Sequence, residues 1–166
     1  MTEFEFELIF RLPDGEGDGA AYLDRLHEAG CDDALVGTGR AGMIVFSFAR
    51  ESATAQEAVE SAIADIGKAI PEAVLVEAFP DYVGVTDLSD ILGHTRQNTR
   101  KLLLGSNAPA PLHVGNPSIW HLSEILEWMK NTGLDRRYKI GQAVNDIAIA
   151  TRKVNFARES ARWQTL

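Results

Sequence analysis

Residues 4–12 read Phe-Glu-Phe-Glu-Leu-Ile-Phe-Arg-Leu, and they begin the pattern that decides the fold. The apolar side chains of Phe4, Phe6, Leu8 and Phe10 fall on one face, whereas Glu3, Glu5, Glu7 and Arg11 fall on the other. Side chains alternate between the two faces of a strand, so this stretch predicts a strand with one buried face.

The rest of residues 1–80 continues with alternating helical and strand patterns. Apolar residues recur at helical spacing from Ala20 to Ala29, before Gly30, and again from Ala55 to Ile70. Short apolar stretches predict strands at 34–36, 43–49 and 74–79. The resulting order β-α-β-β-α-β predicts an α+β ferredoxin-like sandwich, with two helices on one face of a four-stranded antiparallel sheet.

Three motifs in this half resemble binding sites but lack the context that such sites require. Residues 37–42 spell GxGxxG, yet a strand rather than a helix follows, which favours a hairpin loop over a dinucleotide site. Residues 14–19 resemble the start of a calcium loop, but the twelfth position is Arg25 instead of a bidentate glutamate. An RNA-recognition module would need stacking aromatic residues where Met43 and Val45 stand. We therefore expect no metal and no cofactor.

The 166-residue chain has a formal net charge of −8, which is divided unevenly. Residues 1–80 carry 16 acidic and 5 basic side chains, net −11, whereas residues 81–166 carry 8 and 11, net +3. This asymmetry suggests two units with different partners. No apolar run approaches the roughly 20 residues of a membrane span, and Cys31 is the only cysteine, so we expect a cytoplasmic protein.

The segment after Pro80 predicts two short helices joined by a glycine turn. Thr86 is the expected N-cap of the first helix, Gly93 ends it, and Thr95 is the expected N-cap of a second helix that runs to about Leu104. Such a helix-turn-helix inserts its second helix into the major groove of DNA. The plainer alternative is a helical hairpin whose charged side chains face solvent.

The second helix carries side chains suited to DNA. Arg96, Gln97 and Arg100 can form paired hydrogen bonds with base edges, and Lys101 is better suited to phosphate. Asn98 either contacts a base or helps to cap the helix. The stretch 109–120 then predicts a strand, a turn at 115–118 and a second strand, which would form a wing beside the helices.

Residues 83–130 resemble the MerR/AlpA (excisionase-like) winged helix-turn-helix family. The matching residues are Asp87, Leu92, Gly93, Arg96, Gln97, Arg100, Lys101, Pro109, Pro111, Trp120 and Trp128. The resemblance implies DNA contacts by Arg96, Gln97 and Arg100, and wing contacts around His113–Ser118. The chain departs from the pattern at His94, in place of an apolar turn residue, at Ser89, in place of a small alanine, and at His121, in place of a basic residue. The complete set of expected DNA-binding residues is Thr95, Arg96, Gln97, Asn98, Arg100, Lys101, His113, Asn116 and Ser118.

The two tryptophans offer either stacking surfaces for bases or packing of the wing against the next helix, and the frequent burial of tryptophan favours packing. The four histidines lie on separate predicted elements without paired cysteines, so no zinc site is expected.

Residues 136–163 predict one long helix. Its apolar seam comprises Ile140, Val144, Ile147, Thr151, Val154, Arg158 and Ala161, spaced alternately by four and three residues. This seam suggests a dimer; the alternative is a helix packed against its own chain. This arrangement resembles that of MerR-like regulators, which dimerise through a helix that follows the winged domain.

Together these features predict three parts: an acidic sensor or docking domain at 1–80, a winged DNA-binding domain at 81–131, and a C-terminal helix at 136–163. The leading hypothesis is a non-enzymatic, sequence-specific regulator that binds double-stranded DNA as a homodimer. The N-terminal domain would bind a small-molecule effector or a basic partner protein. An alternative is an antitoxin-like interaction protein whose acidic domain neutralises a partner and whose winged domain autoregulates. No catalytic constellation is evident in the sequence.

Overall fold

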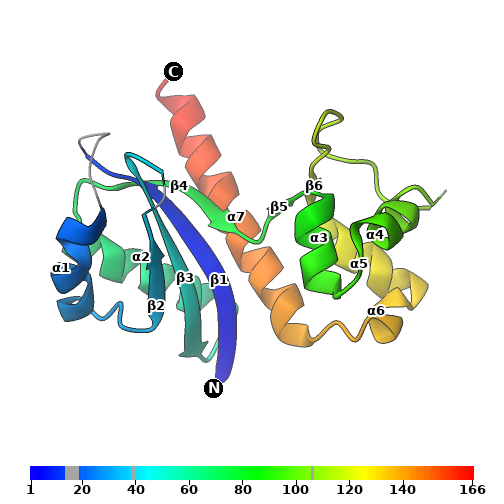
Figure 1. Cartoon of the computed structure of the whole chain (residues 1–166), viewed down its shortest axis with the longest axis horizontal. Helices are drawn as coiled ribbons and strands as arrows, with labels where there is room; N and C mark the ends of the chain where they lie inside the picture. Colours follow the sequence, from blue (N-terminus) through cyan, green and yellow to red (C-terminus); the bar gives the residue numbers. More distant parts are fainter. Residues whose placement is uncertain (14–18, 39, 106) are drawn as a thin grey trace.

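A computed structural model describes residues 1–13, 19–38, 40–105 and 107–166. Most of the calcium-like loop and Gly39 of the GxGxxG motif lie outside this description. The chain is a mixed α+β protein (Figure 1). Its strands are β1 (Thr2–Arg11), β2 (Ala34–Gly37), β3 (Met43–Ser52), β4 (Val74–Phe79), β5 (Tyr82–Val83) and β6 (Trp120–His121). Its helices are the 3-10 turn η1 (Gly19–Tyr22), α1 (Leu23–Glu28), α2 (Ala55–Ala69), α3 (Val85–Leu92), α4 (Arg96–Leu103), α5 (Leu122–Thr132), α6 (Leu134–Arg137) and α7 (Gln142–Gln164).

The first four strands form one antiparallel sheet in the order β2-β3-β1-β4. The predicted alternation of β1 is confirmed, because Phe4, Phe6, Leu8 and Phe10 are buried and Glu3 and Glu5 are exposed. The buried face of the sheet packs with α1 and α2 in one hydrophobic core. β2 and β3 pair in register on either side of residues 38–42, as the predicted hairpin requires.

Cys31 is buried in this unit, and its burial raises the pKa of the thiol to about 11. It lies near a buried guanidinium, Arg50, that forms ion pairs with Asp33 and Asp65. A thiol with so high a pKa stays protonated at neutral pH and is a poor nucleophile. The structure therefore gives Cys31 a packing role.

The buried side chains of a second hydrophobic core come from the range 83–148. It is built from α3, α5 and the short strands β5 and β6, together with Ala148 of α7; Val83, Leu88, Trp120, Ile125 and Met129 are among its buried side chains. We call residues 1–79 the N-terminal unit and residues 80–141 the C-terminal unit.

α7 belongs to both cores and joins the two units (Figure 1). Ile147 and Ala150 pack in the first core, whereas Ala148 packs in the second. β4 is an edge strand of the sheet, and α7 lies against it. Asn155 accepts a hydrogen bond from the Ala78 N–H and donates one to the Ala78 carbonyl, both 2.8 Å long. Through Asn155, α7 thus supplies hydrogen-bond partners for backbone groups on the edge of the sheet that would otherwise be unpaired.

The prediction of one helix over residues 136–163 is wrong in one respect, because the structure has two separate helices, α6 and α7. Between them the backbone of Lys139 is left-handed, with φ of 54°, and Gly141 precedes the start of α7. The Ile140 N–H donates to the Asp135 carbonyl, which closes the turn.

The predicted seam of α7 faces the protein's own chain over most of its length. Ile147 and Thr151 are buried, Val154 packs against the first core, and Ile140 and Val144 pack against the second. Packing against the same chain, the alternative to dimerisation, therefore accounts for this seam. None of the helices in the described ranges is sufficiently long and apolar to span a membrane.

Candidate functional site

The first helix of the predicted pair, α3, begins earlier than its expected cap implies. Gly84 is the N-cap, and its backbone N–H donates to the Asp87 carboxylate at 2.9 Å. Thr86, which was expected to cap the helix, lies inside the first turn, so that prediction is wrong. Asp87 causes the difference, because an acidic side chain three residues after the cap can accept from the cap's free N–H.

The turn between the helices matches its prediction. Gly93 has φ of 67°, a left-handed conformation that favours glycine, and the His94 N–H donates to the Ser89 carbonyl at 3.0 Å. Thr95 then caps α4 by accepting from the Asn98 N–H at 3.2 Å. Asn98 donates only its backbone N–H to this cap, and its side chain, for which capping was one of two alternatives, is exposed.

Buried hydroxyl groups fix α4 against α3. Ser89 Oγ donates to the Val85 carbonyl at 2.7 Å and lies 3.1 Å from Thr99 Oγ1, within hydrogen-bond distance. Both residues are buried. Ser89, a departure from the MerR/AlpA pattern, therefore forms a contact between the helices that alanine would lack.

The opposite side of α4 presents the predicted DNA-binding residues to solvent. Its exposed side chains are Thr95, Arg96, Gln97, Asn98, Arg100 and Lys101. Within the described residues, no carboxylate lies within 4.0 Å of the three cations among them. Among the residues that the structure describes, these cations therefore have no ion-pair partner to displace before they bind an anion.

The predicted wing is much reduced. A single bridge pairs His113 with Ile119, and the strand that follows, β6, pairs with β5 instead of completing a longer hairpin. Pro109, Pro111 and Pro117 lack an N–H donor, which accounts for the short pairing. His113 and Asn116 are exposed and Ser118 is half-buried, with its hydroxyl donating to the Gly115 carbonyl.

Packing, the favoured role for the tryptophans, is confirmed for Trp120. Only 7% of Trp120 is exposed, and its Nε1–H donates to the Pro109 carbonyl at 3.0 Å. Trp128 is half-buried against the same core. The indole of Trp120 thus anchors the start of the loop formed by residues 109–119, which we call the wing loop. Its burial rules out a stacking role for this residue.

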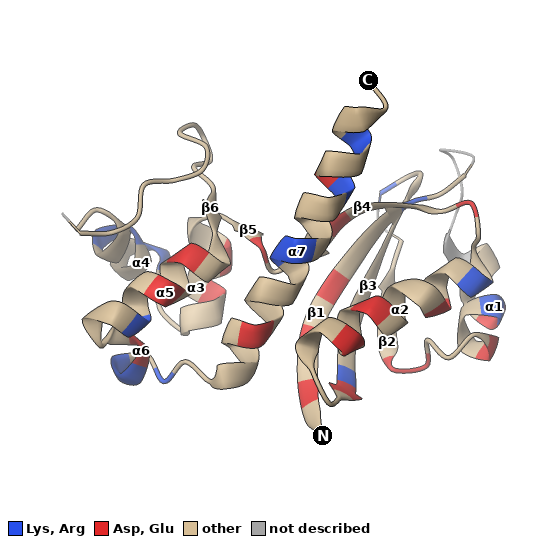
Figure 2. Cartoon of the chain, turned by 180° about the vertical axis from the view of Figure 1, so that it is seen from behind, with Lys and Arg blue, Asp and Glu red and all other residues tan. Residues whose placement is uncertain are grey.

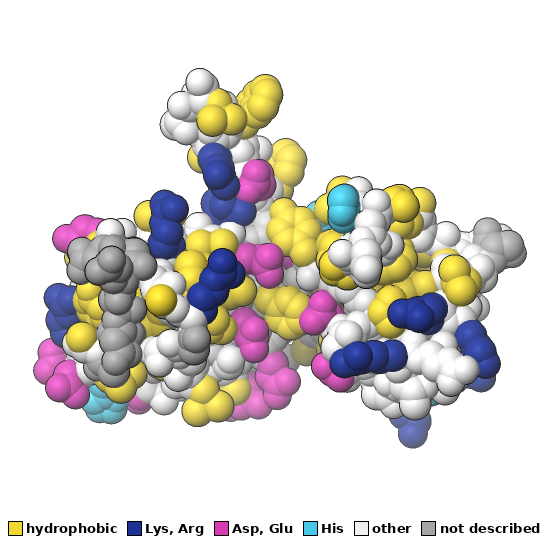
Figure 3. Space-filling model, turned by 45° about the horizontal axis from the view of Figure 1, so that its top comes forward, with side chains coloured by type: hydrophobic (Ala, Val, Ile, Leu, Met, Phe, Trp, Pro, Cys, Tyr) yellow, Lys and Arg dark blue, Asp and Glu magenta, His cyan; other side chains and the backbone are white. Residues whose placement is uncertain are grey.

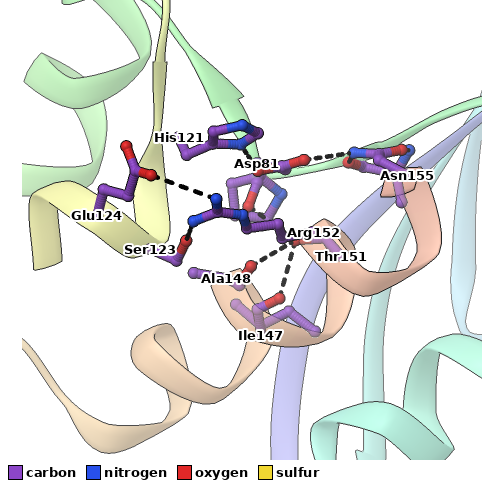
Figure 4. Close-up of polar contacts among 11 residues, drawn as sticks. Asp81, His121, Ser123, Glu124, Ile147, Ala148, Thr151, Arg152 and Asn155 are labelled. Atoms are coloured by element: carbon purple, nitrogen blue, oxygen red, sulfur yellow. Dashed lines mark hydrogen bonds and ion pairs between the residues drawn. The ribbon is translucent and has the colours of Figure 1, made fainter. Parts of the chain in front are cut away.

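A polar cluster that the sequence did not indicate joins the C-terminal unit to α7 (Figure 4). Asp81 is completely buried; one carboxylate oxygen lies 2.7 Å from His121 Nδ1, and the other accepts from Asn155 Nδ2 at 2.9 Å. Thr151 donates to the Pro80 carbonyl at 2.8 Å, and Arg152 donates to Ser123 Oγ at 2.8 Å.

His121 is consequently turned toward the interior, with 14% of its side chain exposed. It stands where the family pattern has a basic residue, but its ring faces the buried Asp81 carboxylate instead of the surface. Asp81 and Asn155 are 74 residues apart, so no local sequence pattern could have paired them.

In the described part of the chain, no group of three or more His, Cys, Asp or Glu side chains is arranged to hold a metal ion. The candidate site is thus the exposed face of α4, whose cations form no ion pair with any described residue, beside a proline-rich loop. Such a face can bind anions and form hydrogen bonds with base edges.

Comparison with protein-family models, with curated proteins and with solved structures found no match.

Proposed function

We propose that the chain is a cytoplasmic, sequence-specific DNA-binding regulator in which α4 enters the major groove. The observation that carries this proposal is the exposed face formed by Arg96, Gln97 and Arg100 on a capped helix that follows a left-handed glycine turn. Arginine and glutamine on such a helix match the donors and acceptors of guanine and adenine.

The fold that we propose is a ferredoxin-like unit followed by a winged helix-turn-helix of the MerR/AlpA kind. The antiparallel strand order β2-β3-β1-β4 supports the first part. The pair α3–α4, followed by the loop anchored at Trp120, supports the second part. His113, Asn116 and Ser118 of this loop would contact the DNA backbone or the minor groove.

Substitution of Arg96 tests the proposed base contact. If Arg96 pairs with a base, Arg96→Ala weakens binding to a duplex selected for tight binding by about 1–3 kcal/mol and relaxes the preference at one position. Arg40→Ala, which removes an exposed arginine from the acidic unit, is the matched control and should bind like wild type. Wild-type affinity and specificity of Arg96→Ala would refute the assignment.

We also propose that the chain forms a homodimer. The residues that would pair the two subunits are not those of the predicted seam. Ile149, Phe156 and Trp163 are spaced by seven residues along α7, and they are 49%, 73% and 76% exposed. Ile149 and Phe156 also line a groove of about 660 Å³ between α5 and α7. Burial of these side chains would favour pairing of two α7 helices. Sedimentation should then show a dimer that Phe156→Glu converts to a monomer.

The alternative of an interaction protein is favoured by one observation on the N-terminal unit. Glu3 and Glu51 lie directly opposite each other in the register of β1 and β3, which is unfavourable for like charges. A basic partner protein bound to this face would relieve the repulsion. Co-purification of a stoichiometric basic protein, abolished when both residues are changed to glutamine, would support this function.

A further inference from the structure

Three basic side chains at the junction of α6 and α7 have no role in the helix pair or the wing loop. Arg136, Arg137 and Lys139 are all exposed, and we call them the α6 cations. They lie 35 residues or more beyond Lys101, outside the segment that resembles the MerR/AlpA family.

An aromatic contact holds this junction beside the turn that precedes α4. The ring of Tyr138 packs against the ring of His94, with 4.6 Å between the centroids and an interplanar angle of 62°. Leu134 and Tyr138 also pack against the second hydrophobic core. His94 directly precedes the N-cap Thr95, so the junction that carries the α6 cations lies beside the turn that leads into α4.

The figures agree with this placement. Figure 1 shows α6 below the turn that joins α3 to α4, and Figure 2 shows basic residues on both α4 and α6 at the end of the molecule away from the sheet. Figure 3 shows basic side chains spaced across the same end of the surface. Two segments far apart in sequence thus present positive charge at one end.

The α6 cations are free of ion pairs within the residues that the structure describes. The acidic residues on the neighbouring segments include Asp90 of α3 and Asp135 of α6, and neither lies within 4.0 Å of a cationic nitrogen there. This end of the molecule therefore combines unpaired cations on two segments with the N-terminus of α4, which carries the positive end of the helix dipole.

We propose that Arg136, Arg137 and Lys139 bind phosphates of the DNA backbone beside the groove that α4 enters. The inference rests on the proposed function and extends its contact surface beyond the helix pair and the wing loop. Contacts to phosphate fix the position of a protein on the duplex without reading its sequence. They also release counterions, so each contact makes binding more dependent on salt.

The test measures binding of the full chain to a fluorescent mixed-sequence duplex over a series of salt concentrations. The double variant Arg136→Ala/Arg137→Ala should bind more weakly, and the slope of log affinity against log salt should fall in magnitude by about 1 for each phosphate interaction that is removed. The reduction in affinity should be equal on a selected duplex. Arg136→Lys/Arg137→Lys keeps both charges and should retain the wild-type slope.

Arg40→Ala/Lys68→Ala is the charge-matched control, because it removes two cations from the acidic unit, and it should also retain the slope. Thermal unfolding monitored by circular dichroism verifies that each variant is folded. If wild type binds DNA and the Arg136→Ala/Arg137→Ala variant has the same slope, the inference is overturned and the proposed function stands. If folded wild type binds no duplex even at low salt, both are overturned.

Discussion

Glu77 shows how the environment of a single residue affects stability. This side chain lies on β4, and burial, reinforced by the charge of Asp81, raises the pKa of its carboxyl group; Arg158 opposes the shift in part. The folded chain therefore holds this proton more tightly than the unfolded chain does. Ionisation of Glu77 must then lower the stability of the fold as pH rises above the ordinary glutamate pKa of about 4.3.

We predict that Glu77→Gln raises the midpoint of thermal unfolding at pH 7, because the substitution removes a poorly solvated charge. The advantage over wild type should shrink as pH falls into the acidic range, where Glu77 becomes protonated in both states. Glu72→Gln, at an exposed position before β4, is the control and should show little change at either pH. A Glu77→Gln midpoint below that of wild type at pH 7 would contradict this explanation.

At the scale of elements, two helices of this chain are capped in the same way. Thr95 accepts from the Asn98 N–H at the start of α4, and Thr54 accepts from the Glu57 N–H at the start of α2. Loss of such a cap lowers the free energy of unfolding by about 0.5–2 kcal/mol. We predict a loss in this range for both Thr95→Ala and Thr54→Ala, measured by denaturant unfolding.

The two variants should differ in their binding to DNA. Thr95→Ala loosens the helix that we propose to enter the groove, so its affinity for a selected duplex should fall, whereas Thr54→Ala should bind like wild type. The same loss of affinity in both variants would show that DNA binding depends on general stability instead of the order of α4.

Elements encoded by neighbouring residues were predictable from the sequence. The alternation of Phe4 to Phe10 specifies β1, and Gly93 and Thr95 specify the turn and start of α4, because each signal acts over a few residues. The wing was overestimated, since its prolines limit pairing to one bridge. The pairing of β6 with β5 joins residues about 40 positions apart, which the local pattern does not encode.

At the scale of the whole molecule, α7 ties the two units together. Asn155 satisfies the Ala78 N–H and carbonyl as well as the buried Asp81 carboxylate. The sequence showed an apolar seam on this helix but not its partner surface, because Asn155 and Thr151 act through contacts more than 70 residues away. The predicted division at Pro80 therefore separates two charge distributions, while both units share one helix.

We predict that Asn155→Ala is strongly destabilising, because each buried polar group left without a partner costs about 1–3 kcal/mol. Asn145→Ala, on the first turn of the same helix, loses one exposed hydrogen bond to Gly141 and should have a small effect. Wild type should also unfold in one step, with far-ultraviolet circular dichroism and tryptophan fluorescence giving the same midpoint. Separate midpoints would mean that α7 does not couple the units.

The distribution of charge constrains the DNA binding that we propose. A net charge of +3 on residues 81–166 is modest, and the −11 on residues 1–80 repels phosphate. For the binding that we propose, affinity would come from particular contacts of α4, the wing loop and the α6 cations, and the proposed second subunit would double their number. We therefore expect binding to be selective for sequence as well as sensitive to salt.

The most direct test of DNA recognition is selection from a pool of random duplexes at moderate salt, with purified full-length protein and sequencing after several rounds. Wild type should enrich one recurring motif, and the Arg96→Ala/Arg100→Ala variant should fail to enrich it although it remains folded. A pool that stays random after selection with folded wild-type protein would contradict the proposal that α4 reads DNA sequence.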